Sequence, residues 1–216
     1  AKRKELISAI VAAGERLIAA DPADWKSRVM STVLDLNQRY PGDIGVLGAL
    51  LLNHIELSPG EAVYLDAGQL HAYVSGLGVE IMANSDNVLR GGLTPKFVDV
   101  PELVKVLTYA AADEPRVQQQ DKSAQDNVHD VAAWSYPVPI EEFLLDRVEL
   151  TGSSSVDLDF DGPTIALCTA GSVTFTDAAG KTLTVTPGQA VWLPAAEGLV
   201  TATAESDAAD LFVARA

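Results

Sequence analysis

The sequence contains two copies of one strand–turn–strand pattern, and this repeat limits the folds open to the chain more than any other feature. The first copy is IELSPGEAVYLDA, from Ile55 to Ala67, and the second is LTVTPGQAVWLPA, from Leu183 to Ala195, at a constant offset of 128 residues. In each copy a β-type run meets a Pro-Gly turn and a second β-type run follows. The chain is therefore predicted to contain two β-rich regions of one kind.

The two copies differ at the positions where chemistry is expected. His71 follows the first copy, and the offset of 128 places Leu199 at the corresponding position of the second. Glu80 corresponds in the same way to Ala208. The second region is therefore predicted to be a scaffold that lacks the pocket, with Trp192 as a candidate core residue.

The first forty residues have the pattern of a helical hairpin. Asp21-Pro22 is expected to begin the second helix, as an N-cap followed by proline at the first helical position. Tyr40-Pro41 is expected to end that helix. The apolar residues at three- and four-residue spacing are Leu6, Ile10, Ala13 and Leu17 in one helix and Trp25, Val29, Val33 and Leu36 in the other.

Short β-type runs and turn residues follow the helices. The pattern divides the chain into the end of a helical domain (1–40), part of a first β-barrel (41–110), a polar linker (111–139) and a second β-barrel (140–216). Strands are expected in the first barrel at 55–57, 62–65, 70–74 and 78–82, and in the second at 143–150, 164–169, 173–176, 181–186 and 190–193.

Composition excludes several classes of partner. The formal charge is −15, from 15 basic and 30 acidic residues, and such a surface repels nucleic acid and acidic membranes. The longest apolar stretch, Val46 to Leu52, is too short to cross a bilayer. Cys168 is the only cysteine, which excludes an internal disulfide and favours the cytoplasm.

The densest group of functional side chains lies between His71 and Lys96. It contains a histidine, two carboxylates and two cations in a glycine-rich β-type context. No lysine or arginine occurs between Arg39 and Arg90, so Arg90 and Lys96 are the cations nearest a pocket in this segment. We expect this pair to bind a phosphorylated, polyhydroxylated ligand.

This segment, HAYVSGLGVEIMANSDNVLRGGLTPK, resembles the second signature of the type I mannose-6-phosphate isomerases, a family of the cupin superfamily. The resemblance extends upstream through 53–65 and 40–45, weakens in the linker and returns at YPVPIEEF, residues 136–143. Gly91 departs from the family, which usually has alanine there. The chain thus looks like the C-terminal half of such an isomerase.

The resemblance implies a mainly β fold with cupin-type jelly-roll barrels, one partial and one complete, preceded by a helical segment. The partial barrel, 41–110, would be catalytic and the barrel at 140–216 non-catalytic. The chain begins without methionine inside a helical pattern, which leads us to expect a missing N-terminal half. That half, or a second copy of the chain, is the expected protein partner.

The resemblance also implies a zinc-dependent isomerase that interconverts mannose 6-phosphate and fructose 6-phosphate through an enediol. His71 matches a zinc ligand, and the family's other three ligands would lie upstream. Arg90 matches the catalytic arginine. Glu80 matches a pocket residue and is a candidate proton carrier. Lys96, Tyr73 and Asp86 are candidate substrate-binding residues, with Lys96 matching a second pocket residue.

Two other interpretations use the same residues. A non-catalytic bicupin could bind a carbohydrate or have a regulatory role, but it would not need His71 beside Glu80. A cupin oxygenase is disfavoured because the sequence has no His-x-His pair. The isomerase is therefore the leading hypothesis.

Overall fold

The structure is a computed structural model that describes residues 2–85, 88–111, 115–123, 131–159 and 161–216. The chain forms two compact units. The first comprises Ala1–Ser58, Leu65–Leu77 and Asp86–Asp113, and the second comprises Pro59–Tyr64, Gly78–Ser85 and Glu114–Ala216. The chain thus leaves the first unit and returns to it twice.

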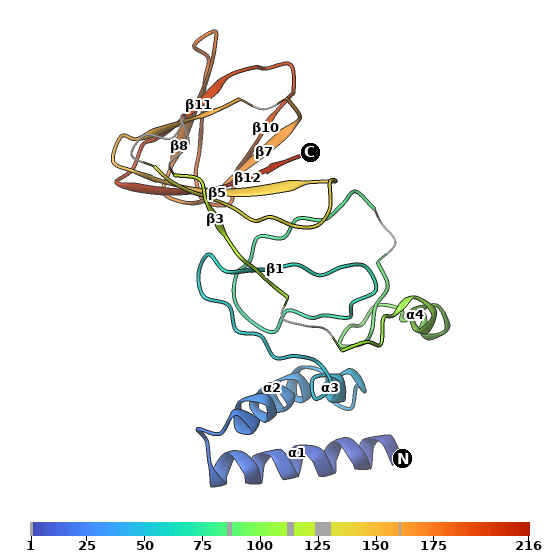
Figure 1. Ribbon diagram of the computed structural model, residues 1–216. Coiled ribbons are helices and arrows are strands. Elements are labelled where there is room, and N and C mark those ends of the chain that lie inside the picture. Colours follow the sequence, from blue (N-terminus) through green and yellow to red (C-terminus); the bar gives the residue numbers. More distant parts are fainter. Residues whose placement is uncertain (1, 86–87, 112–114, 124–130, 160) are drawn as a thin grey trace. The chain divides into compact units, whose positions relative to one another are not determined.

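The first unit begins with the predicted helical hairpin (Figure 1), formed by α1 (Lys2–Ala20) and α2 (Trp25–Arg39). The prediction that Asp21 caps the second helix is wrong. Asp24 is the N-cap, and its carboxylate accepts a hydrogen bond from the Lys26 amide at 3.0 Å. Asp21 instead accepts from the Ala23 amide at 3.1 Å, so it caps the turn that contains Pro22.

Helix α2 ends where the Tyr40-Pro41 pair predicted, with Tyr40 as its C-cap. The short helix α3 (Gly45–Gly48) follows, and α4 (Val100–Val106) lies later in the chain. The buried side chains that join α2 to α3 are Val33, Leu36 and Val46, with Met30, Ala49 and Leu93 packed against them. Leu93 comes from the segment after Arg90, so this cluster also supports the candidate site.

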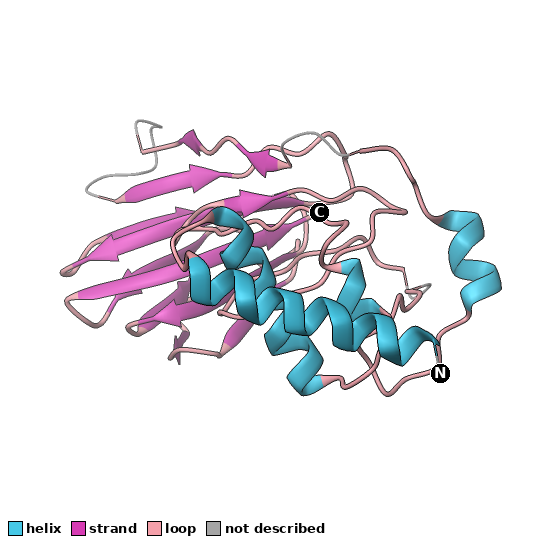
Figure 2. Ribbon diagram, turned by 90° about the horizontal axis from the view of Figure 1, so that it is seen from below, coloured by secondary structure: helices cyan, strands magenta, loops and turns pink. Residues whose placement is uncertain are grey.

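The second unit is a sandwich of two antiparallel sheets, drawn in magenta in Figure 2. The six-stranded sheet has the order β10-β7-β12-β5-β4-β3 and the four-stranded sheet the order β6-β11-β8-β9. A separate two-stranded ribbon pairs β1 (Ala62–Val63) with β2 (Arg116–Val117). The sandwich strands are β3 (Gln120–Asp121), β4 (Ala132–Ser135), β5 (Leu144–Thr151), β6 (Ser155–Leu158), β7 (Thr164–Ala170), β8 (Val173–Asp177), β9 (Thr182–Val185), β10 (Ala190–Leu193), β11 (Val200–Ala204) and β12 (Ala208–Arg215).

One hydrophobic core lies between the two sheets, because alternate residues of facing strands point inward. Leu150 and Leu211 of the six-stranded sheet and Val173 of the four-stranded sheet are completely buried in it. Trp192 is not part of this core. It lies on the outer face of β10, beside Ile165 of β7, and is 59% exposed.

The mainly β prediction is confirmed, and two facing antiparallel sheets are the architecture of a jelly-roll barrel. All five strands predicted in the second barrel are present, whereas β6, β11 and β12 were not predicted. The first β region differs from expectation. Residues 55–57, 70–74 and 78–82 are described and contain no strand, and of 62–65 only Ala62–Val63 pairs.

The difference has a physical reason. A strand exists only where a neighbouring backbone accepts and donates its hydrogen bonds. Among the described residues of this region, the ribbon partner β2 pairs with Ala62–Val63, and the Tyr64 amide adds one bond to the Pro115 carbonyl next to it. No helix of the described ranges is long and apolar enough to span a membrane.

Candidate functional site

The segment that carries His71 begins at a turn packed against the end of α4. Gly68 has a φ of +81°, and a Cβ there would lie 2.7 Å from the Val106 carbonyl oxygen. The Gly68 carbonyl accepts a hydrogen bond from the Thr108 amide at 2.9 Å. This backbone contact explains why glycine occupies the turn, and it fixes where the His71 segment starts.

His71 itself is exposed, and its ring is oriented by a local hydrogen bond. Nδ1 lies 3.0 Å from the Gln69 carbonyl oxygen. A carbonyl only accepts, so Nδ1 is the donor of this bond, and in the neutral imidazole the lone pair then lies on Nε2. Tyr73 contacts the ring edge to face, with centroids 5.9 Å apart, and is 73% exposed. His71 is thus prepared to bind a ligand through Nε2.

Three residues after His71, the backbone of Val74 is bonded by Arg39, a residue that no local sequence pattern connects with this segment. The Arg39 guanidinium donates to the Val74 carbonyl at 3.4 Å and forms an ion pair with Asp35 at 2.8 Å. Both Arg39 and Asp35 belong to the last turns of α2. The i,i+4 spacing of Asp35 and Arg39 was a visible signal for the ion pair, but nothing local pointed to Val74.

The segment after Arg90 is packed against the helical part of the first unit. Gly92 has a φ of +131°, and a Cβ there would lie 3.3 Å from Gly45 Cα. Leu93, with a φ of +53°, packs on the buried cluster of α2 and α3. Arg90 is exposed beside this anchored turn. A Cβ at Gly91 would meet only the flexible end of Leu70, so alanine at this position needs little adjustment.

The predicted site residues fall in both units. His71, Tyr73, Arg90 and Lys96 belong to the first unit, and all four are exposed. Glu80 belongs to the second unit. Asp86 lies outside the described residues.

The exposure of Lys96 and the absence of a three-residue metal site among the described residues bear on ligand binding. The Lys96 amide donates to the Thr94 hydroxyl at 3.2 Å, which fixes the backbone and leaves the ammonium group exposed. Among the described residues, no three His, Cys, Asp or Glu side chains come together as a metal site. The described residues around His71 therefore do not form a complete metal site.

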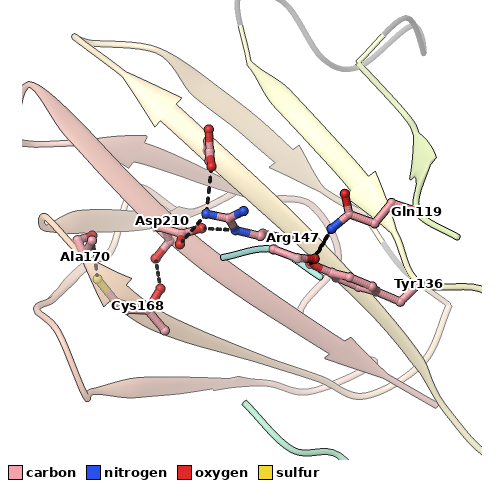
Figure 3. Close-up of polar contacts among 9 residues, drawn as sticks. Gln119, Tyr136, Arg147, Cys168, Ala170 and Asp210 are labelled. Atoms are coloured by element: carbon pink, nitrogen blue, oxygen red, sulfur yellow. Dashed lines mark hydrogen bonds and ion pairs between the residues drawn. The ribbon is translucent and has the colours of Figure 1, made fainter. Parts of the chain in front are cut away.

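Arg147 and its partners form a polar group in the second unit that no local sequence pattern indicated (Figure 3). Arg147 on β5 forms two hydrogen bonds to Asp210 at 3.0 Å each and an ion pair with Glu149 at 2.7 Å. The rings of Trp134 and Phe212 lie 5.6 and 5.8 Å from its guanidinium carbon. The bonds to Asp210 raise the pKa of Arg147.

Arg147 and Asp210 lie diagonally across two adjacent strands. In the register of β5 and β12, Glu149 is opposite Asp210 and Arg147 is opposite Phe212. Sequence spacing gives no sign of this pairing. Close by, Cys168 is buried, and burial raises the pKa of its thiol.

Known proteins resemble the chain in sequence. No family model matches it. A mannose-6-phosphate isomerase of Emericella nidulans is 41% identical over 157 residues, which is 68% of this chain and 34% of that protein. The mannose-6-phosphate isomerase of Escherichia coli K12 is 35% identical over 170 residues, 79% of this chain and 41% of that protein. The chain therefore spans about two fifths or less of the length of these relatives.

Solved structures resemble it in fold. A Salmonella typhimurium mannose 6-phosphate isomerase bound to fructose 6-phosphate and zinc is 26% identical and superimposes with a TM-score of 0.73 over 98% of this chain and 53% of that one. Three solved variants of the Salmonella protein replace a histidine, a glutamate and an arginine by alanine, at intervals of nine and ten residues. His71, Glu80 and Arg90 follow one another at the same intervals. Sequence and fold together place this chain in the mannose-6-phosphate isomerase family, as a match to part of the length of its members.

Proposed function

We propose that this chain is part of a zinc-dependent isomerase that interconverts mannose 6-phosphate and fructose 6-phosphate. The observation that carries the proposal is the order and spacing of His71, Glu80 and Arg90. The same residue types at the same intervals are replaced in variants of the Salmonella enzyme, one structure of which contains fructose 6-phosphate and zinc, and this agreement supports the proposal. A non-catalytic carbohydrate-binding module would have no need for a metal ligand in this pattern.

His71 fits the role of one zinc ligand. Its Nδ1 is hydrogen-bonded to the Gln69 carbonyl, which leaves the lone pair of Nε2 for the metal. A catalytic zinc takes about three protein ligands and keeps one position open. When bound, the metal acts as a Lewis acid on the substrate oxygens. No three possible ligands come together among the described residues, so the proposal requires further ligands from outside this group.

Arg90 and Glu80 are proposed to have different roles in the reaction. Isomerisation moves a proton between C1 and C2 through an enediol, while negative charge develops on the two neighbouring oxygens. Arg90 presents a planar guanidinium that can donate to both oxygens, and Glu80 is the carboxylate that can carry the proton. This assignment keeps charge stabilisation and proton transfer on separate side chains.

Substrate binding is assigned to three other residues. Lys96 presents an exposed ammonium group suited to the phosphate, on a turn fixed through Thr94. Tyr73 lies against His71 and can reach sugar hydroxyls next to it. Asp86 is proposed for the same role from its position in the sequence. A cytoplasmic location fits the single cysteine and the sugar-phosphate substrate.

The Salmonella variants also support the expectation that this segment is only part of the site. Other solved variants of that protein replace a histidine, a lysine and a glutamate. All three lie at least 121 residues before the replaced histidine whose spacing matches that of His71. The present chain covers 53% of the Salmonella chain. We therefore expect that the 216-residue chain alone neither holds zinc tightly nor isomerises sugar phosphates.

The test is metal analysis after gel filtration, combined with an assay for fructose 6-phosphate, on this chain and on the whole protein from which it derives. The proposal expects zinc and turnover in the whole protein, and the loss of both when His71 is replaced by alanine. Zinc and turnover that survive His71→Ala would refute the ligand assignment. A whole protein with zinc but no isomerase activity would refute the reaction.

A further inference from the structure

The Pro-Gly turns of the two repeats have the same backbone shape but different surroundings. Gly60 has a φ of +89° and Gly188 a φ of +85°, so both need the left-handed conformation that glycine adopts readily. A Cβ at Gly188 would meet nothing within 4 Å. A Cβ at Gly60 would lie 2.8 Å from Arg147 Nη1 and 3.4 Å from Gln119 Nε2. The turn of the first repeat is therefore enclosed, and that of the second is open.

Two side chains, those of Gln119 and Tyr136, donate hydrogen bonds to the Gly60 carbonyl and are also bonded to each other. Figure 3 shows both of them together with Arg147. The Tyr136 hydroxyl donates to that carbonyl at 2.9 Å, and Gln119 Nε2 donates to it as well. Gln119 Nε2 also donates to the Tyr136 oxygen at 3.1 Å. Both lone pairs of the carbonyl and the hydroxyl proton are thus used. We call Gln119, Tyr136 and Arg147 the Gly60 socket.

Two residues of the socket, Tyr136 and Arg147, lie next to or on strands of the sandwich. Tyr136 directly follows β4 and is 4% exposed. Arg147 is fixed by Asp210 and Glu149 and lies between two aromatic rings. The chain leaving Gly60 is held further by the ribbon of β1 and β2 and by the Tyr64 amide, which donates to the Pro115 carbonyl at 3.0 Å. His71 follows Tyr64 by seven residues.

We propose that the Gly60 socket makes the second β region a positioning element for the reaction, although that region lacks the counterparts of His71 and Glu80. By holding the first repeat at Gly60, Tyr136 and Gln119 fix the point from which the His71 segment departs. They act through this backbone and do not touch the substrate. The inference rests on the proposed function, and it gives the scaffold repeat a role beyond stability.

The two glycines provide a matched pair of variants. Gly60→Ala and Gly188→Ala impose the same left-handed strain on alanine, but only Gly60→Ala collides with the socket. Tyr136→Phe removes the hydroxyl and keeps the packing. Amide hydrogen exchange of residues 62–64 in this chain measures the hold on the first repeat. We expect about a three- to tenfold faster exchange in Gly60→Ala and Tyr136→Phe, the effect of losing one or two net hydrogen bonds, and no local change in Gly188→Ala.

Steady-state kinetics of the whole isomerase measure the consequence. We expect Gly60→Ala and Tyr136→Phe to lower kcat by about three- to tenfold with little change in KM, because a misplaced His71 weakens stabilisation of the transition state more than binding of the ground state. Gly188→Ala should leave kcat unchanged. Equal effects of the two glycine variants, or faster exchange with an unchanged kcat, would overturn the proposal. A wild-type protein without isomerase activity would instead refute the proposed function, and the exchange data would still decide whether the socket holds the turn.

Discussion

Replacing Trp192 by alanine tests whether the outer face of the six-stranded sheet is exposed in solution. The side chain is 59% exposed, so about two fifths of its area lies against neighbours such as Ile165. A fully covered aromatic side chain buries roughly 200 Å². Two fifths of that area, at about 25 cal/mol per Å², corresponds to about 2 kcal/mol as an upper estimate. No internal cavity forms at a surface position, so we expect a loss of about 1–2 kcal/mol.

Leu211→Ala is the matched control from the same sheet. Leu211 lies on β12 and is completely buried in the core between the sheets. Its truncation removes apolar contacts and leaves a cavity, which costs about 3–5 kcal/mol. Leu211→Ala is therefore expected to cost about 1–4 kcal/mol more than Trp192→Ala, although tryptophan is the larger side chain.

Urea unfolding of both variants, followed by circular dichroism and fitted with a shared m-value, measures the two losses. If Trp192→Ala destabilises the chain as much as Leu211→Ala, Trp192 is covered in solution. The outer face would then be buried by other residues or by a second copy, and the exposure-based estimate would be refuted. A concentration-dependent midpoint would identify the second copy.

Three further predictions concern single groups. Arg90→Lys in the whole protein should lower kcat for mannose 6-phosphate more than it raises KM, because lysine keeps the charge but loses the planar set of donors; an unchanged kcat in steady-state assays would remove Arg90 from catalysis. Burial raises the pKa of the Cys168 thiol above its ordinary 9.0, so the unfolded chain releases this proton first and stability should fall as pH rises above about 9. Cys168→Ala should remove that part of the pH dependence in urea unfolding between pH 7 and 10, and an unchanged slope would contradict the assignment. Gln189 accepts hydrogen bonds from the Thr186 amide and hydroxyl at 2.9 and 3.0 Å, so Gln189→Ala should cost about 1 kcal/mol in the β9–β10 turn without changing the zinc content of the whole protein; a loss of zinc would show that the second repeat contributes to the site.

Local sequence patterns predicted those features that depend on neighbours along the chain. The helical hairpin, the end of α2 at Tyr40 and the two Pro-Gly turns all follow from side-chain spacing and from residues that favour turns. Five strands of the second barrel were also predicted, because short β-type runs between turn residues mark them, whereas β6, β11 and β12 were not. Aspartate is a good helix cap at both position 21 and position 24. Asp24 is the N-cap because the turn at Pro22 lies between Asp21 and the start of α2.

Features that depend on distant residues were not predictable in this way. The first repeat has the same strand pattern as the second, yet only Ala62–Val63 pairs, with Arg116–Val117 far along the chain. Trp192 has the sequence context of a core residue, but a strand's two faces are distinguished only by what packs on each. For the candidate site, the dense group of charged residues drew attention to the segment from His71 to Lys96, and the roles of its residues stay predictions that follow from the family resemblance.

The sequence by itself thus determined the mainly β class and the duplicated Pro-Gly turn, and it singled out the segment proposed to carry the chemistry, because residue type and periodicity are local properties. Only the tertiary structure decided how that segment is held. Arg39 reaches Val74, and Gly60 is enclosed by Gln119, Tyr136 and Arg147, while the equivalent Gly188 remains open. These contacts join residues far apart in the chain. Their free energy depends on distances and desolvation that exist only once the sheets have formed, so no local pattern records them.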